Sequence, residues 1–129
     1  MNDVIGLCLI GAGRAGMIHA YNFVSRVPHA KMVAVSDVME ESAKRAAKEL
    51  GIDSWYTDYK QAIAHPDVDA VIVATPTQYH HDIVIYAAKA KKHIFCEKPM
   101  AMTTDECAAM IETAKKNDVK LQIGFMRRF

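Results

Sequence analysis

The chain of 129 residues has the length of one domain, and its 51% hydrophobic and 24% charged residues are an ordinary globular composition, which excludes intrinsic disorder and a collagen-like structure. Its 16 basic and 15 acidic side chains leave a net charge of +1, so no bulk attraction to nucleic acid or to an anionic membrane is expected. The amino-terminal segment has no basic region before its apolar run, and glycines interrupt that run, which argues against a signal peptide and a membrane span.

Short runs rich in β-branched residues alternate along the chain with apolar stripes at helical spacing. In chain order, the first half predicts a strand at Val4–Ile10, a helix with its stripe from Met17 to Val27, a strand at Lys31–Ser36, a helix closed by Gly51, a weaker strand at Ser54–Thr57 and a short helix at Tyr59–Ala64. The second half predicts a strand at Asp69–Ala74, a helix around Ile83–Ala88, a strand at Lys92–Cys96, a helix that begins with a capping box of Thr103 and Glu106, and a strand at Val119–Phe125.

Strands that are apolar on both faces, separated by amphipathic helices, indicate an α/β fold with a parallel sheet covered on both sides. Six strands joined by five right-handed crossovers predict a doubly wound sheet of order 3-2-1-4-5-6. No linker, repeat or low-complexity tract interrupts the pattern, so residues 1–129 are expected to form one domain.

A glycine motif, Gly11–Gly16 with the sequence GAGRAG, follows the first strand and opens the first helix. Its glycines allow a tight turn, a close approach of a pyrophosphate to the backbone, and close packing of the helix on the strand. The free N–H groups of the first helical turn attract an anion. This context predicts a Rossmann-type dinucleotide-binding domain, whose pyrophosphate contacts are Gly11, Gly13, Arg14, Ala15 and Gly16. A glycine turn without a ligand is the alternative, and Arg14 is equally compatible with a solvated helix residue.

Asp37 ends the second strand, about 20 residues after the last glycine, where a carboxylate can accept hydrogen bonds from the adenosine ribose. Such a carboxylate repels a 2′-phosphate, and neither Val38 nor Met39 is the basic residue that an NADP pocket usually has. The sequence therefore favours NAD over NADP. The alternative role for Asp37 is the N-cap of a helix over Met39–Leu50.

More polar residues follow the later strands, on the same carboxyl edge of the predicted sheet. Thr75, Pro76 and His80 follow the fourth strand, and Glu97-Lys98-Pro99 follows the fifth. Because proline disfavours a helical conformation of the residue before it, Lys98 is expected to be held extended. A cis Lys98–Pro99 bond is one way to aim it further.

These segments, together with Gly124–Arg127, resemble the amino-terminal domain of the Gfo/Idh/MocA oxidoreductases, above all inositol 2-dehydrogenase-like members, from Ile5 to Phe129. The resemblance implies that Glu97 bonds the nicotinamide ribose and that Lys98 is a catalytic residue beside the nicotinamide and the substrate hydroxyl. It also implies that Thr75, Pro76 and His80 line the cofactor path and that Arg127 helps to close it. The implied reaction is hydride transfer between NAD and a carbon of a small polyol or sugar.

The chain departs from the family pattern in length, because family members continue into a substrate domain that carries a carboxylate and a histidine for proton transfer and mediates oligomerisation. We expect that domain to be absent from residues 1–129, so the chain alone is expected to bind the cofactor with little or no turnover, and a homo-oligomer belongs to the complete enzyme. Lys91 stands where many members have a helix-ending glycine, and a left-handed conformation there costs about 1 kcal/mol.

Two further hypotheses remain open at this point. One is a stand-alone, non-enzymatic dinucleotide-binding or sensing module that acts through a partner, and the other is a half-enzyme completed by a separate polypeptide. No metal site is expected, because the adjacent His80 and His81 diverge on a helix. The cysteines Cys8, Cys96 and Cys107 are odd in number and lack CxxC spacing, which argues against a disulfide scaffold or a zinc ribbon and favours a cytoplasmic location. Cys96 is expected to be a buried structural thiol. His19 is expected to be a surface or packing residue.

Overall fold

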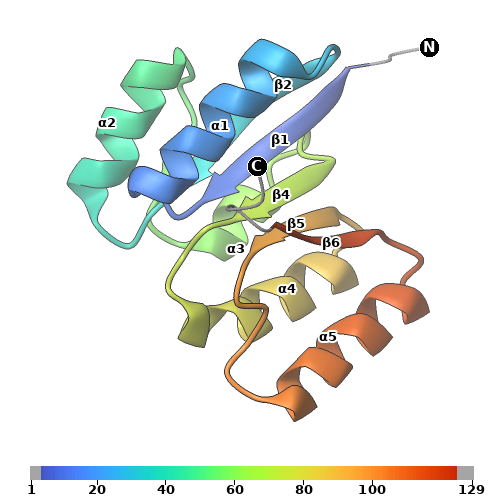
Figure 1. The fold of residues 1–129 in the computed structure, drawn as a ribbon. Coiled ribbons are helices and arrows are strands. Elements are labelled where there is room, and N and C mark those ends of the chain that lie inside the picture. Colours follow the sequence, from blue (N-terminus) through green and yellow to red (C-terminus); the bar gives the residue numbers. More distant parts are fainter. Residues whose placement is uncertain (1–3, 125–129) are drawn as a thin grey trace.

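A six-stranded parallel sheet forms the centre of the computed structural model, which describes residues 4–124 (Figure 1). The strand order is β3-β2-β1-β4-β5-β6, which confirms the predicted doubly wound topology. The strands are β1 Ile5–Ile10, β2 Ala30–Ser36, β3 Trp55–Tyr56, β4 Ala70–Val73, β5 His93–Glu97 and β6 Leu121–Gly124. The expected strands all form, although most of them are shorter at one or both ends than the pattern predicts.

Helices cover the two faces of this sheet in separate groups (Figure 1). They are α1 Arg14–Arg26, α2 Glu40–Leu50, α3 Tyr59–Ile63, α4 His80–Lys89 and α5 Thr104–Lys116, with a short 3-10 helix, η1, at Thr77–Tyr79. Helices α1 and α2 pack on one face, and α3, α4 and α5 pack on the other. In the part of the chain that the structure describes, no helix combines the length and the apolar character needed to cross a bilayer.

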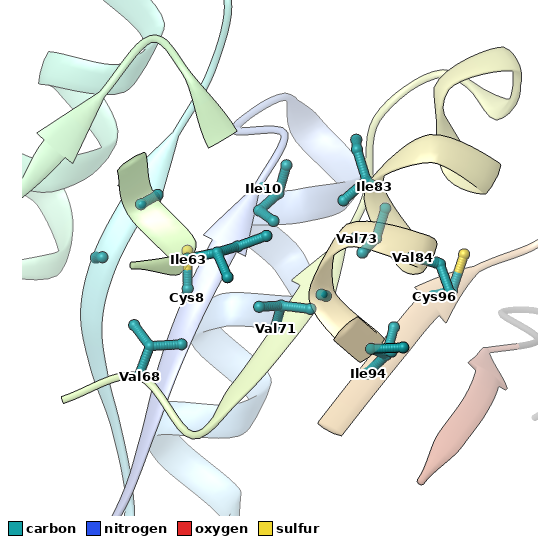
Figure 2. Packing of buried hydrophobic residues seen from close by; sticks show 14 of the residues in the cluster. Cys8, Ile10, Ile63, Val68, Val71, Val73, Ile83, Val84, Ile94 and Cys96 are labelled. Atoms are coloured by element: carbon teal, nitrogen blue, oxygen red, sulfur yellow. The ribbon is translucent and has the colours of Figure 1, made fainter. Parts of the chain in front are cut away.

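The core alternates between the two faces along each central strand, because successive side chains of a strand point to opposite sides. In β1, Leu7 and Leu9 pack toward α1 and α2, whereas Cys8 and Ile10 pack toward α3 and α4. Figure 2 shows the apolar cluster on the face covered by α3, α4 and α5, in which Ile63 of α3 lies beside the central strands. Both faces of the central strands are therefore apolar; among the described residues, the buried polar side chains are Ser36, at the end of β2, and His80, at the start of α4.

Two helix ends have the residues that the sequence predicts. Gly51 ends α2 in the left-handed conformation, with φ of +70°. Thr103 caps α5, because its hydroxyl accepts a hydrogen bond from the Glu106 N–H at 3.1 Å. The reciprocal bond of the capping box is displaced by one residue: the Glu106 carboxylate accepts from the N–H of Met102, at 3.0 Å, and not from that of Thr103.

Lys91, which follows α4, has φ of +65° although it carries a Cβ. Its side chain is exposed, so no packing contact depends on it. We predict that Lys91→Gly raises the free energy of unfolding by about 0.5–1 kcal/mol, because relief of the left-handed strain exceeds the entropy that glycine adds to the unfolded chain. Urea denaturation measures the change.

The control is Lys91→Ala, which removes the charge and keeps the Cβ. We expect its stability to stay close to that of the wild type. Equal stabilisation by alanine and glycine would assign the effect to charge and contradict the argument from φ.

Candidate functional site

The glycine motif forms the turn from β1 into α1, on the carboxyl edge of the sheet, which is the edge where β1, β2, β4 and β5 end. Gly11 has φ of +98°, and its N–H donates to the carbonyl of Ser36 at 2.9 Å. A Cβ at Gly11 would lie 2.7 Å from the carbonyl of Ala74, the residue that follows β4. The turn is thus pressed against both neighbouring strands, and only glycine fits there.

The other two glycines of the motif differ in their surroundings. A Cβ at Gly16 would overlap the carbonyl oxygen of Gly11, so the start of α1 can close onto the turn only without a side chain. A Cβ at Gly13 would meet nothing within 4 Å. Gly13 therefore leaves an open cradle at the helix start, and it provides no side-chain cap for the helix.

This helix start suits an anion. The first turn of α1 contains no acidic residue, and Arg14, its first residue, is exposed. Free N–H groups and the positive end of the helix dipole then face the cradle at Gly13. The residues present fit the pyrophosphate of a dinucleotide, for which this arrangement is a general binding mode.

Asp37, directly after β2, ties the turn to the second strand. One carboxylate oxygen, Oδ2, accepts from the N–H of Ala12 at 2.8 Å, and the other, Oδ1, accepts from the N–H of Met39 at 2.9 Å. Helix α2 begins at Glu40 with Met39 as its N-cap residue and no side-chain cap. Asp37 is therefore not the helix N-cap, because its carboxylate bonds the N-cap residue itself. A carboxylate has about four acceptor sites, so two remain for a ribose diol.

His80 joins the segments that follow β4 and β5. It is 1% exposed, and its Nε2 lies 2.8 Å from the carbonyl oxygen of Thr75, while its Nδ1 lies 3.0 Å from that of Pro99. The family resemblance implies that this imidazole lines the cofactor path. The structure instead buries it, with each ring nitrogen within hydrogen-bond distance of a main-chain carbonyl oxygen; a neutral imidazole donates to only one of the two. The hydroxyl of Thr75 is buried and has no hydrogen-bond partner, whereas Pro76 is exposed.

The segment after β5 presents Lys98 to solvent. The Lys98–Pro99 peptide bond is cis, and Lys98 is exposed. The carboxylate of Glu97 accepts from the N–H of Lys98 at 3.2 Å and from Nε2 of His19 at 2.7 Å. Sequence reasoning missed the second contact, because His19 lies on α1, far from Glu97 in the chain. Its position three residues after Gly16, on the helix that the motif opens, is the only signal that the sequence offers.

The cysteine beside this segment, Cys96, is buried. Burial raises the pKa of Cys96 to about 12, with a further contribution from the Glu97 carboxylate, so the thiol stays protonated at neutral pH. Its sulfur lies 3.4 Å from Nδ1 of His80. Cys96 is thus a buried structural thiol, as the sequence predicts.

Two further predictions from the sequence concern Arg127 and a metal site. Arg127 lies outside the described residues. Within residues 4–124, no group of three or more histidine, cysteine or acidic side chains is arranged to hold a metal ion. Of the residues that the sequence predicts for the site, the structure places Gly11–Gly16, Asp37, Thr75 and Glu97-Lys98 at or just after the ends of strands on the carboxyl edge.

Comparison with known proteins identifies a dinucleotide-binding family over nearly the whole chain. The family described as "Oxidoreductase family, NAD-binding Rossmann fold" (GFO_IDH_MocA) matches residues 5–125. Scyllo-inositol 2-dehydrogenase (NAD(+)) of Bacillus subtilis is 43% identical over 129 residues, all of this chain and 38% of that protein. Myo-inositol 2-dehydrogenase of Thermotoga maritima is 45% identical over 121 residues, which are 94% of this chain and 36% of that protein.

Solved structures agree. Scyllo-inositol dehydrogenase from Lactobacillus casei with bound NAD(H) and scyllo-inositol has a TM-score of 0.89 at 34% identity, over 98% of this chain and 37% of that chain. The chain thus spans less than two fifths of the length of these relatives. The turn, the strand order and the family match lead to one conclusion: this chain belongs to the Gfo/Idh/MocA oxidoreductases and forms their NAD-binding Rossmann domain.

Proposed function

We propose that this domain binds NAD in a dehydrogenase that oxidises a secondary hydroxyl of a small polyol, of the inositol type. The observation that carries the proposal is one continuous set of contacts along the carboxyl edge. It runs from Asp37 through the turn at Ala12 and Gly11 to the segment after β4, and through His80 to Pro99 beside Lys98. A dinucleotide is an extended ligand, and this edge presents suitable groups along its length.

The adenosine half is proposed to lie toward β2. There the carboxylate of Asp37 accepts hydrogen bonds from the ribose hydroxyls, while its bond to Ala12 holds the carboxylate beside the turn. A 2′-phosphate at this place would meet a negative charge, so NAD is favoured over NADP. The pyrophosphate then falls on the open backbone of Gly13 and on the N–H groups of Arg14, Ala15 and Gly16.

The nicotinamide half is proposed to lie over β4 and β5, near Thr75, Pro76 and Glu97. When bound, NAD supplies the acceptor for the hydride. Lys98 is proposed as the catalytic residue, because its ammonium can hold the substrate hydroxyl and stabilise the negative charge that develops as the hydroxyl proton passes to the proton-transfer residues of a substrate domain. The hydrogen bond from the Lys98 N–H to Glu97 fixes the backbone from which that ammonium extends.

The substrate class rests on the relatives, since those named above act on scyllo-inositol or myo-inositol. A complete enzyme of this kind needs residues beyond the described part of this chain, and a homo-oligomer is part of the same proposal. Cys8, Cys96 and Cys107 are free thiols, which supports a reducing cytoplasm as the location. The competing proposal is a dinucleotide-binding module without enzymatic activity, and turnover by a suitable chimera separates the two.

One prediction of the proposed function concerns Asp37 and the choice between NADH and NADPH. Asp37→Ala should weaken NADH binding by about 1–3 kcal/mol, because hydrogen bonds between a carboxylate and the ribose are lost. NADH fluorescence titration of the purified chain measures the loss. Because Asp37 also bonds Ala12, the same titration with NADPH is needed.

Damage to the turn alone weakens NADH and NADPH equally. Loss of a ribose contact instead raises the affinity for NADPH relative to NADH, since the repulsion of the 2′-phosphate disappears with the carboxylate. An unchanged affinity for NADH would remove Asp37 from the site.

Another prediction of the proposed function concerns the catalytic role of Lys98. We replace the corresponding domain of the Bacillus subtilis scyllo-inositol 2-dehydrogenase with this chain and assay NAD-dependent oxidation of scyllo-inositol. Lys98→Ala in that chimera should lower kcat by about 10²- to 10⁴-fold, the range for a residue that assists proton transfer, with NADH binding preserved.

Lys98→Arg serves as the matched control, because it keeps the charge and changes its shape, and it should restore only part of the activity. A chimera that binds NADH and keeps its kcat after Lys98→Ala would show that Lys98 has another role. A chimera that binds both ligands without turnover would favour the non-enzymatic module.

A further inference from the structure

Glu97 is held by the protein on both carboxylate oxygens. Oε1 accepts from the N–H of Lys98 at 3.2 Å, and Oε2 accepts from Nε2 of His19 at 2.7 Å. Because a carboxylate only accepts, the imidazole must donate in the second contact. Both side chains are 13% exposed, so water competes little for this bond.

His19 is itself fixed in place by packing. Its ring meets the ring of Phe95 edge to face, with 5.1 Å between centroids, and Phe95 meets Phe23 in the same way at 5.6 Å. His19 and Phe23 both belong to α1, and Phe95 and Glu97 belong to β5. The imidazole therefore stands on the helix whose first turn faces the pyrophosphate and reaches across to the strand that carries Glu97.

The direction in which a bound dinucleotide would run places its second half near the contact between His19 and Glu97. If the adenosine lies at Asp37 and the pyrophosphate at the glycine turn, the second half of a dinucleotide continues toward the ends of β4 and β5. Glu97 is the last residue of β5, and its carboxylate lies at this end of the strand. Two of its roughly four acceptor sites are used by His19 and Lys98, so about two remain for ribose hydroxyls.

We propose that His19 is a positioning residue for the second ribose of the dinucleotide, acting through Glu97. It holds the carboxylate in one orientation before the ligand arrives, so binding does not have to order that side chain. The inference rests on the proposed NAD site and adds a residue to it. It assigns no contact between His19 and the ligand itself.

The test uses ligands that differ in the second ribose. ADP has the adenosine and the pyrophosphate only, ADP-ribose adds the second ribose, and NADH adds the nicotinamide. His19→Phe keeps a ring against Phe95 and removes the donor. It should raise the Kd of ADP-ribose and of NADH by about 5- to 20-fold, less than the full value of a hydrogen bond to a charged group because His19 acts on the ligand only through Glu97, and leave the Kd of ADP within about twofold. Calorimetric titration of the purified chain measures all three.

Two variants test whether the effect passes through Glu97. His19→Gln retains an amide N–H donor and should recover most of the affinity for ADP-ribose. In a Glu97→Ala background, His19→Phe should have little further effect, because the carboxylate that His19 orients is already absent. His65→Phe, the same substitution at the opposite edge of the sheet where His65 bonds Asp67, should leave all three affinities unchanged.

The possible results separate this inference from the proposed function. Equal weakening of ADP, ADP-ribose and NADH by His19→Phe would make His19 a support of the fold and overturn the inference. So would an unchanged affinity for ADP-ribose, or full additivity with Glu97→Ala. A wild-type chain that binds none of the three ligands would instead overturn the proposed NAD site.

Discussion

The close contact between the glycine turn and the start of α1 is the constraint on which the rest of this structure depends. Gly16 must lack a side chain for the helix to approach the carbonyl of Gly11, and Gly11 must lack one to lie against Ala74. Once the turn has this shape, the first N–H groups of α1 face outward over Gly13, where nothing fills the space. The backbone alone is thus suited to hold an anion there, without a charged side chain.

Side chains then connect this turn to the neighbouring strands. Asp37 binds it from β2, and His19 reaches from α1 to Glu97 on β5. The buried His80 joins the carbonyls of Thr75 and Pro99. The side chains of Asp37 and His80 contact main-chain groups, and His19 donates to the Glu97 carboxylate, so these side chains are held in place before any ligand binds. Pre-organised groups lower the entropy that binding must overcome.

The sequence predicts the strand order, the helices and the turn, because these depend on local patterns: alternation between strands and helical stripes, glycine spacing and caps. It predicts the place of Asp37 and Lys98 because parallel strands end at a common edge. It does not predict which side chain bonds which. The pairing of His19 with Glu97 and the burial of His80 depend on helix packing over 78 and 19 residues of chain separation, and no local pattern encodes them.

The most direct test of this account is a titration of the ¹⁵N-labelled chain with NADH, followed by amide chemical shifts. The account predicts that the shifts change at Gly13, Asp37, Thr75 and Glu97, along the carboxyl edge, and stay constant at Asp67 and Asp69, at the opposite edge of the sheet. Changes confined to the opposite edge, or no changes at a saturating concentration of NADH, would contradict it.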